Sequence, residues 1–235
     1  MNLELLNEAL PLLFKGAQVT LLIGLFGIVL GFPLGIVFAL ARLSSNRLLS
    51  RVTSAYSAFF RGTPMLVQIF ILYYGFGQLS FVRESTVVWW LIGSSLHCAM
   101  LAVVLNTVAY ASEIFRGGFQ SVPRGQVEAG LACGMTKWTL LRRVRFPLAI
   151  RQALPAYGNE VAIVIKESSL ASTITVLEIT GYAKRLMSET FAIIEIFAIA
   201  SCFYLVLNVL ALTLVRLMER RLNGAGMART THTRI

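Results

Sequence analysis

The stretch GAQVTLLIGLFGIVLGFPLGIVFALA, residues 16–41, carries no charge over 26 consecutive positions. A helix needs about 20 apolar residues to cross the hydrocarbon core of a bilayer, so this stretch predicts a membrane-spanning helix. Within it, Gly27, Gly31 and Gly35 recur every fourth residue and therefore share one helix face. Glycines in this pattern allow a second helix to approach closely, and we expect such packing here.

The composition of the whole chain also indicates a membrane protein. Of 235 residues, 57% are hydrophobic and only 14% are charged, whereas soluble domains have about 25% charged residues. The net charge of +10 could by itself indicate nucleic-acid binding. The basic residues lie beside the apolar runs, however, so they indicate membrane topology and no nucleic-acid partner. The three cysteines lack CxxC spacing, and we expect neither a disulfide framework nor a metal site.

Four further membrane spans are predicted. Three of them follow from runs with little or no charge, at residues 53–81, 86–112 and 191–215. The fourth begins after Arg151 and is less apolar, because Glu160 interrupts it and Lys166 and Glu167 follow it. Counting it places 16 of the 21 Lys and Arg residues on the cytoplasmic side, as the positive-inside rule requires. The predicted fold class is therefore all-α and polytopic, with five transmembrane helices, the N-terminus outside and the C-terminus inside.

This topology divides the chain into a periplasmic N-terminal segment (1–15), a membrane domain (16–216) and a cytoplasmic C-terminal tail (217–235). The first apolar run is too long for a cleaved signal peptide, so we expect it to be retained. Residues 113–151 form a cytoplasmic loop within the membrane domain. Loops of this length are usually functional.

The loop contains the stretch EAGLACGMTKWTLLRRVRFP, residues 128–147. Apolar residues recur at helical spacing in two stripes: Val127, Leu131 and Met135, then Trp138, Leu141 and Val144. Gly134 would allow a bend between two short helices, and Pro147 would end the second helix and start the next span. Such a pair of helices could lie on the membrane surface or dock into a groove on a partner protein.

The same stretch resembles the EAA motif of ABC importer permeases, which reads E-A-A-x-x-x-G, nine residues, then I-x-L-P. Matching positions are Glu128, Ala129, Gly134 and Pro147, and conservative departures are Gly130, Val144 and Phe146. Glycine in place of alanine at position 130 would soften the first helix by about 1 kcal/mol.

Four more stretches extend the resemblance along nearly the whole chain. They are FRGTPMLVQIFILYYG (60–75), LNTVAYASEIFRGG (105–118), LPAYGNEVAIVIKESSLAST (154–173) and IEIF (194–197). Together they resemble the polar-amino-acid branch of type I ABC importers, and most of all the M-type subunits of histidine, arginine and opine (octopine or nopaline) importers. The resemblance implies a type I permease fold for residues 16–216 and a location in the bacterial inner membrane.

The resemblance also implies a heteromeric importer for a cationic amino acid (arginine, histidine or ornithine) or an opine. Its expected partners are membrane lipid, a second permease subunit that is a different chain, a periplasmic substrate-binding protein and an ATPase dimer that docks on residues 124–147. The chain has no G-x-x-x-x-G-K-[ST] phosphate loop, so we expect it to bind no cofactor and to be no enzyme. ATP would be bound by the partner ATPase. The expected ATPase-coupling residues are Glu128, Ala129, Gly130, Gly134 and Pro147.

Two acids are candidates for substrate binding. Glu160 and Glu167 are seven residues apart, which is about two turns and roughly 10 Å along one helix face. Acids inside a membrane normally face protein or a water-filled cavity. Two carboxylates would suit an α-ammonium group and a distant guanidinium, and the resemblance implies acids at these positions in relatives that handle basic amino acids. In the alternative, Lys166 or an arginine neutralises one of them structurally.

Polar residues on the third span could also line the path. Asn106, Tyr110 and Glu113 share one helix face, and we expect Glu113 to pair with Arg116 three residues later while Asn106 and Tyr110 contact substrate. The RGTP sequence at 61–64 predicts a bend at the start of the second span. Its arginine would anchor at the lipid headgroups, and the glutamine at 68 could form an interhelical hydrogen bond.

Two other functions remain open. A proton- or cation-coupled secondary transporter would use Glu160 and Glu167 as a relay, but it would leave the long loop without a role. A membrane enzyme would need a metal-ligand cluster, a nucleophile–base pair or a cofactor loop, and the sequence shows none of these. An ABC permease subunit uses both the acids and the loop, and it is the predicted function.

Overall fold

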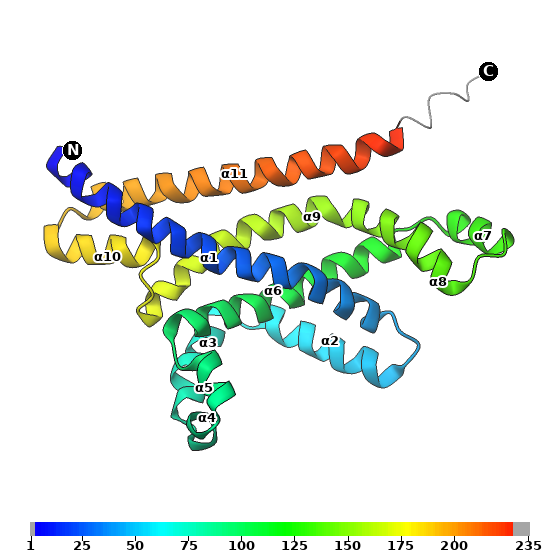
Figure 1. Cartoon of the computed structure of the whole chain (residues 1–235), viewed down its shortest axis with the longest axis horizontal. Helices are drawn as coiled ribbons and strands as arrows, with labels where there is room; N and C mark the ends of the chain where they lie inside the picture. The colour runs from blue at the N-terminus through cyan, green and yellow to red at the C-terminus, as the bar shows by residue number, and fades with distance from the viewer. Residues whose placement is uncertain (1–2, 228–235) are drawn as a thin grey trace.

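A computed structural model describes residues 3–227, and within this range every regular element is helical (Figure 1). The elements are α1 (Leu3–Arg42), α2 (Arg47–Gly62), α3 (Met65–Phe70), η1 (Ile71–Gly75), η2 (Phe76–Gln78), α4 (Ser80–Glu84), α5 (Thr86–Ile92), α6 (Ser95–Gln120), α7 (Arg124–Ala132), α8 (Lys137–Leu140), η3 (Leu141–Arg145), α9 (Phe146–Glu167), η4 (Ser168–Ile174), α10 (Ile179–Thr190) and α11 (Ile193–Met227). The segments η1 and η3 are π-helical, and η2 and η4 are 3₁₀-helical.

The glycine face of α1 packs against α6. A Cβ atom on Gly27 would lie 2.5 Å from Cγ1 of Val103, and one on Gly31 would lie 2.5 Å from Cγ2 of Thr107. The third glycine of the series faces Ala111. The facing residues on α6 are themselves four apart, so two matching rows meet. The predicted close approach of a second helix is therefore confirmed, and it fixes the register of α1 on α6.

Helix α9 lies inside the bundle, packed against α6, α1 and α11 (Figure 1). Its register against α6 is set by the stacked rings of Phe115 and Tyr157, whose centroids are 5.3 Å apart. Gly158 supports the contact with α11, because a Cβ there would lie 2.7 Å from Cγ1 of Val215. Residues of α9 are thus surrounded by protein on several sides.

Three helical segments are long and apolar enough to cross a membrane: Leu5–Arg42, Ser95–Gln120 and Ile193–Arg221. A fourth candidate arises if Arg47–Gly62 and Met65–Gln78, which meet at an angle of 104°, are counted as one broken span. Helix α9 does not qualify by composition. The prediction of five spans therefore stays a prediction.

The boundaries of two predicted spans were wrong. The span at 53–81 is interrupted after Gly62, because proline disfavours helical backbone at the preceding residue and Thr63 is extended. The span at 86–112 is interrupted at Gly93, and α6 then continues beyond the predicted end to Gln120, so that Glu113 lies on the helix whose face it was predicted to share.

The N-terminal residues do not form a separate segment within the described part of the chain. Helix α1 starts at Leu3 and continues without a break into the glycine-rich stretch. Ala9 and Leu13 are fully buried, in a cluster that also contains residues of α10 and α11.

Helices α7 and α8, with η3, project from one end of the bundle as a helical knob (residues 124–145; Figure 1). Gly134 has a φ of +76° at the bend between the two helices, as predicted. Pro147 was wrongly predicted to end a helix. The backbone stays helical from Lys137 to Glu167, because the π-helical turn at 141–145 accommodates the missing N–H and the bulky ring in the first turn of α9.

Candidate functional site

Glu160 is the most unusual acid of the described chain. It lies on α9 with only 4% of its surface exposed. Among the residues whose side chains are described, none forms an ion pair or a hydrogen bond with its carboxylate. A carboxylate near the centre of a bilayer costs about 2.5–3.5 kcal/mol even on the lenient insertion scale. An acid kept here without a partner is therefore a candidate for binding a cation.

Tyr110 on α6 lies at the level of Glu160. The two helices run antiparallel, and the Phe115–Tyr157 stack gives their register. Tyr110 lies five residues before Phe115 on α6, and Glu160 lies three residues after Tyr157 on α9. Because the helices are antiparallel, both offsets point the same way along the bundle. With a rise of 1.5 Å per residue, the two residues differ in height by roughly 3 Å. Two of the four predicted substrate residues thus lie at a similar height on neighbouring helices.

Arg61 joins the same site, although the sequence predicted it at the lipid headgroups. It lies in the last turn of α2, and its guanidinium carbon is 5.6 Å from the centroid of the Tyr110 ring. Among the described residues no ion pair joins it to Glu160, so its charge reaches that carboxylate only at longer range. The positive-inside rule places a basic residue relative to the membrane but cannot detect an acid or a ring on another helix. This is why the contacts of Arg61 were missed, while its predicted position at the headgroups stays a prediction.

Glu113 connects three helices at the inner side of this site. Its carboxylate is 2.6 Å from Nη1 of Arg42 on α1 and 3.2 Å from Nη1 of Arg61 on α2, and it also pairs with Arg116 on α6. The predicted pair with Arg116 is confirmed. The two long-range pairs were missed, because no local spacing in the sequence reports them. Three guanidinium groups share one carboxylate, so this cluster keeps an excess of positive charge.

Asn106 is buried one turn away from Tyr110, but its amide is already bound. Its Nδ2 donates to Oε1 of Gln68 at 3.1 Å and to the carbonyl of Phe60 at 3.3 Å. Gln68 in turn donates to the carbonyl of Phe60 at 2.8 Å and to that of Thr63 at 3.0 Å. The predicted interhelical hydrogen bond of Gln68 is confirmed. Together the two amides satisfy carbonyl groups that the break between α2 and α3 leaves free.

Glu167 is the last residue of α9, two turns beyond Glu160 and half-buried. Lys166 forms no ion pair with either acid within the described residues. It lines a separate cavity of about 350 Å³ with Thr180 and Tyr204. The predicted alternative, in which Lys166 or an arginine of another helix neutralises one of the acids, finds no ion pair among the described residues.

Near that cavity lies Glu178, a fully buried acid that the sequence analysis did not single out. It caps α10 by accepting hydrogen bonds from the backbone N–H groups of Thr180 and Gly181, at 3.0 Å and 2.8 Å. The hydroxyl of Tyr204 on α11 also donates to it. Since these donors satisfy the carboxylate, its role is to join α10 to α11.

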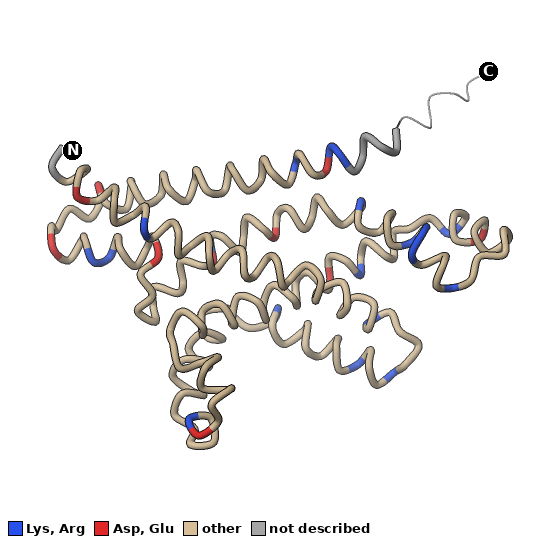
Figure 2. The backbone as a smooth tube through the Cα atoms, viewed as in Figure 1, with Lys and Arg blue, Asp and Glu red and all other residues tan. Residues whose placement is uncertain are grey.

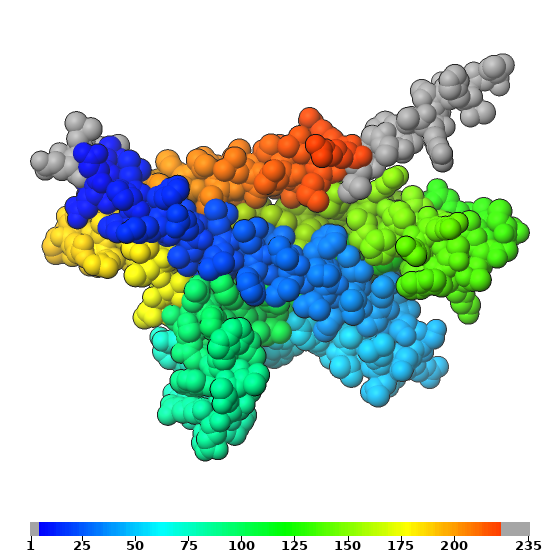
Figure 3. Space-filling view, in the orientation of Figure 1, coloured from blue at the N-terminus to red at the C-terminus, as the bar shows by residue number. Residues whose placement is uncertain are grey.

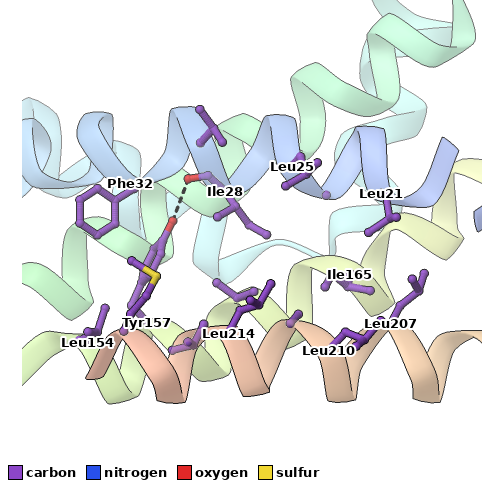
Figure 4. A pocket seen from close by; sticks show the side chains of 16 residues that line it. Leu21, Leu25, Ile28, Phe32, Leu154, Tyr157, Ile165, Leu207, Leu210 and Leu214 are labelled. Carbon is purple, nitrogen blue, oxygen red and sulfur yellow. Dashed lines mark hydrogen bonds between the residues drawn. The ribbon is translucent and has the colours of Figure 1, made fainter. Parts of the chain in front are cut away.

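A larger cavity of about 630 Å³ lies between α1, α9 and α11, and apolar side chains line it (Figure 4). Leu21, Leu25 and Phe32 face Leu210 and Leu214 across it (Figure 4). None of the described residues that line this cavity is charged. It is a poor site for a cationic ligand, because nothing in it would replace the hydration of the charge.

The helical knob exposes the predicted coupling residues on a projecting surface (Figure 3). Glu128, Ala129 and Gly134 are exposed there, as is Pro147 at its base. Gly130 is buried instead, because a Cβ on it would lie 2.5 Å from Cδ1 of Leu140. Glycine at 130 therefore has a packing reason, since it lets α7 lie close to α8.

Two apolar side chains of the knob face outward. Trp138, expected on the packed stripe of the second helix, is 69% exposed, and Leu131 is exposed as well. Two other members of the stripes, Val127 and Leu141, pack against the bundle. The knob thus presents an apolar surface beside its charged residues, which is the composition of a docking site.

Comparisons with known proteins agree with this architecture. A model of the family described as "Binding-protein-dependent transport system inner membrane component" matches residues 31–224. The nopaline transport system permease protein NocM of Agrobacterium fabrum is 44% identical over 233 residues, which cover 99% of this chain and 97% of NocM. The histidine/lysine/arginine/ornithine transport system permease protein HisM of Salmonella typhimurium is 36% identical over 208 residues, which cover 88% of each chain.

Among solved structures, an amino acid ABC transporter with histidines superimposes with a TM-score of 0.83 and 32% identity, over 94% of this chain and 99% of that one. The fold is therefore that of a type I ABC permease, and the alternative of a secondary transporter is excluded. The match covers the site helices as well as the knob, because it extends over almost the whole chain. This chain belongs to the family of binding-protein-dependent transport system inner membrane components.

Proposed function

We propose that this chain carries a cationic amino acid or an opine across the bacterial inner membrane, and that Glu160 receives the positive charge of the ligand. The observation that carries the proposal is a buried carboxylate that has no ion-pair or hydrogen-bond partner among the described residues and lies at the level of an aromatic ring. The names of the relatives, a nopaline permease and a histidine/lysine/arginine/ornithine permease, support this substrate class. As a family member, the chain is a transport subunit and not the ATPase.

Each predicted site residue has a role in this proposal. Glu160 pairs with a guanidinium or ammonium group, and the ring of Tyr110 offers a cation–π contact, which contributes about 0.5–2 kcal/mol. Glu167, two turns along α9, receives the second positive group of a dibasic ligand. Asn106 holds the neighbouring chain break in position through Gln68.

The proposed topology has five spans, with the N-terminus outside and the C-terminus inside. The three apolar helices, the bent pair α2–α3 and the enclosed helix α9 together support it. Basic positions gather at the end of the molecule that carries the knob, and the middle of the long helices is nearly free of charge (Figure 2). That distribution is typical of a cytoplasmic end. The domain limits proposed from the sequence, 16–216 with loop 113–151, follow from this topology.

The proposed partners are an ATPase dimer, a substrate-binding protein and a second permease subunit of different sequence. Residues 124–147 would dock on the ATPase, with Glu128 in the charged part of the contact and Trp138 in the apolar part. Because α8 continues through η3 into α9, a push on the knob would move the helix that carries Glu160. Alternating access would follow from this mechanical link.

The test is uptake of arginine by vesicles that contain the chain with its ATPase, its second permease and its binding protein. We expect uptake to require ATP and Glu160→Gln to lower it at least tenfold, because a charge-assisted hydrogen bond contributes about 1.5–3 kcal/mol. Glu189→Gln, an equal loss of charge at an exposed position, is the control. ATP-dependent uptake that is the same in Glu160→Gln and wild type would overturn the proposal.

A further inference from the structure

We propose that Arg61 is a built-in substitute for the ligand's cation: in the empty path its guanidinium takes the cation position over the ring of Tyr110, and only a positively charged ligand can replace it. Arg61 would then determine specificity for charge. The inference rests on the proposed function, since it assigns the same carboxylate to the ligand.

The Arg61 guanidinium lies where a cationic ligand would bind. It lies over the ring of Tyr110, 5.6 Å from the centroid, where an arginine ligand would make the same contact. Its Nη1 lies 3.2 Å from the carboxylate of Glu113. No ion pair with the described residues involves Glu160, so the charge of Arg61 reaches that carboxylate only at longer range. A ligand guanidinium and the Arg61 guanidinium therefore compete for one place.

Arg61 is also the least firmly held of the three cations around Glu113. Arg42 is closer to that carboxylate, at 2.6 Å, has only 12% of its side chain exposed and donates to Ser57 and Ser112. The side chain of Arg61 is 38% exposed, and it makes no hydrogen bond to other described residues beyond its ion pair. When Arg61 leaves, Glu113 keeps two guanidinium partners. Its departure therefore leaves no unpaired acid at Glu113.

The backbone around Arg61 permits such a movement. The residue lies in the last turn of α2, directly before Gly62, and no neighbouring atom would contact a Cβ on that glycine within 4 Å. The chain then turns by 104° into α3. A long side chain at an open helix end can change rotamer without displacing a packed core.

The exchange of Arg61 for the ligand's cation makes the site selective for positively charged ligands. A neutral ligand that displaced Arg61 would remove a positive charge from the surroundings of the buried Glu160 and put none in its place, which is costly in a low-dielectric path. A cationic ligand restores the balance. If the site is free of Arg61 for about a tenth of the time, the apparent affinity for a cationic ligand is reduced by about tenfold relative to an open site.

The test is the equilibrium binding of arginine to the detergent-purified permease–ATPase complex without the binding protein. We expect Arg61→Gln to lower the apparent Kd about tenfold, and Arg61→Lys, which keeps the charge, to stay within about threefold of wild type. In the double variant Arg61→Gln/Glu160→Gln the Kd should equal that of Glu160→Gln alone, because no competition remains. Thermal melting of each complex shows whether a variant is folded, and Arg61→Lys is the second probe if Arg61→Gln is not.

The outcomes separate the inference from the proposed function. If Glu160→Gln weakens binding but Arg61→Gln leaves it unchanged or weakens it too, Arg61 is a structural ion pair and the inference alone is overturned. An unchanged Kd in Glu160→Gln would overturn the proposed function and this inference with it. Tighter binding in Arg61→Gln that persists in the double variant would also contradict the inference, because the competition would not involve Glu160.

Discussion

The close contact of α1 with α6 predicts that the substitution Gly31→Ala destabilises the protein. The added Cβ would lie 2.5 Å from Cγ2 of Thr107, whereas two carbon atoms normally keep about 3.5–4.0 Å apart. Thr107 is 1% exposed and β-branched, so it can hardly rotate away. The helices must therefore separate by about 1 Å, and overpacking of this kind costs about 1–3 kcal/mol.

The assay is thermal melting of the purified chain in detergent. A loss of this size lowers Tm by roughly 2–12 °C for a chain of this length. Gly24→Ala on the same helix is the matched control, because its Cβ would lie 3.5 Å from Cγ1 of Ile165, an ordinary contact. Thr107→Ser removes the obstructing methyl group and should restore part of the lost stability in Gly31→Ala. Equal Tm values for Gly31→Ala and Gly24→Ala, or a failure of Thr107→Ser to restore any stability, would refute the reasoning.

Two further predictions concern the knob and α10. Gly130→Ala should lower transport-coupled ATP hydrolysis several-fold while changing Tm by less than about 2 °C, because the one close contact of its Cβ is with the flexible end of the Leu140 side chain. Leu140→Ala should restore coupling, and coupling that stays normal in Gly130→Ala would argue against the close contact of α7 and α8. Glu178→Ala should cost about 0.5–2 kcal/mol in thermal stability through the lost helix cap, whereas Glu189→Ala at the exposed end of the same helix should stay within about 0.5 kcal/mol of wild type. Equal melting of these two variants would show that Glu178 does not hold α10.

The features that the sequence predicted correctly depend on local spacing. The close approach of a second helix to the glycine series of α1 was predicted correctly, because a period of four residues defines a helix face wherever the helix lies. The turn at Gly134 and the pair Glu113–Arg116 are equally local. Glu160 was recognisable because an acid in an apolar stretch is costly, and that cost does not depend on the arrangement of the other helices.

The features that were missed depend on residues far apart in the chain. Arg61 and Glu113 are 52 positions apart, and only the packing of α2 against α6 brings them together. The continuous helix through Pro147 required a π-helical turn, which propensity does not indicate. Asn106 has the spacing of a path-lining residue, yet its amide is taken by Gln68 after the chain folds back. Long-range partners of this kind could be found only once the fold was known.

The central claim is that Glu160 meets the positive charge of the ligand. The most direct measurement compares the equilibrium binding of arginine with that of citrulline, in which a neutral urea group replaces the guanidinium, to the permease–ATPase complex. The wild type should prefer arginine by about tenfold to a hundredfold, since a hydrogen bond to a charged group contributes about 1.5–3 kcal/mol. Glu160→Gln should abolish that preference. A preference for arginine that persists undiminished in Glu160→Gln would contradict the account.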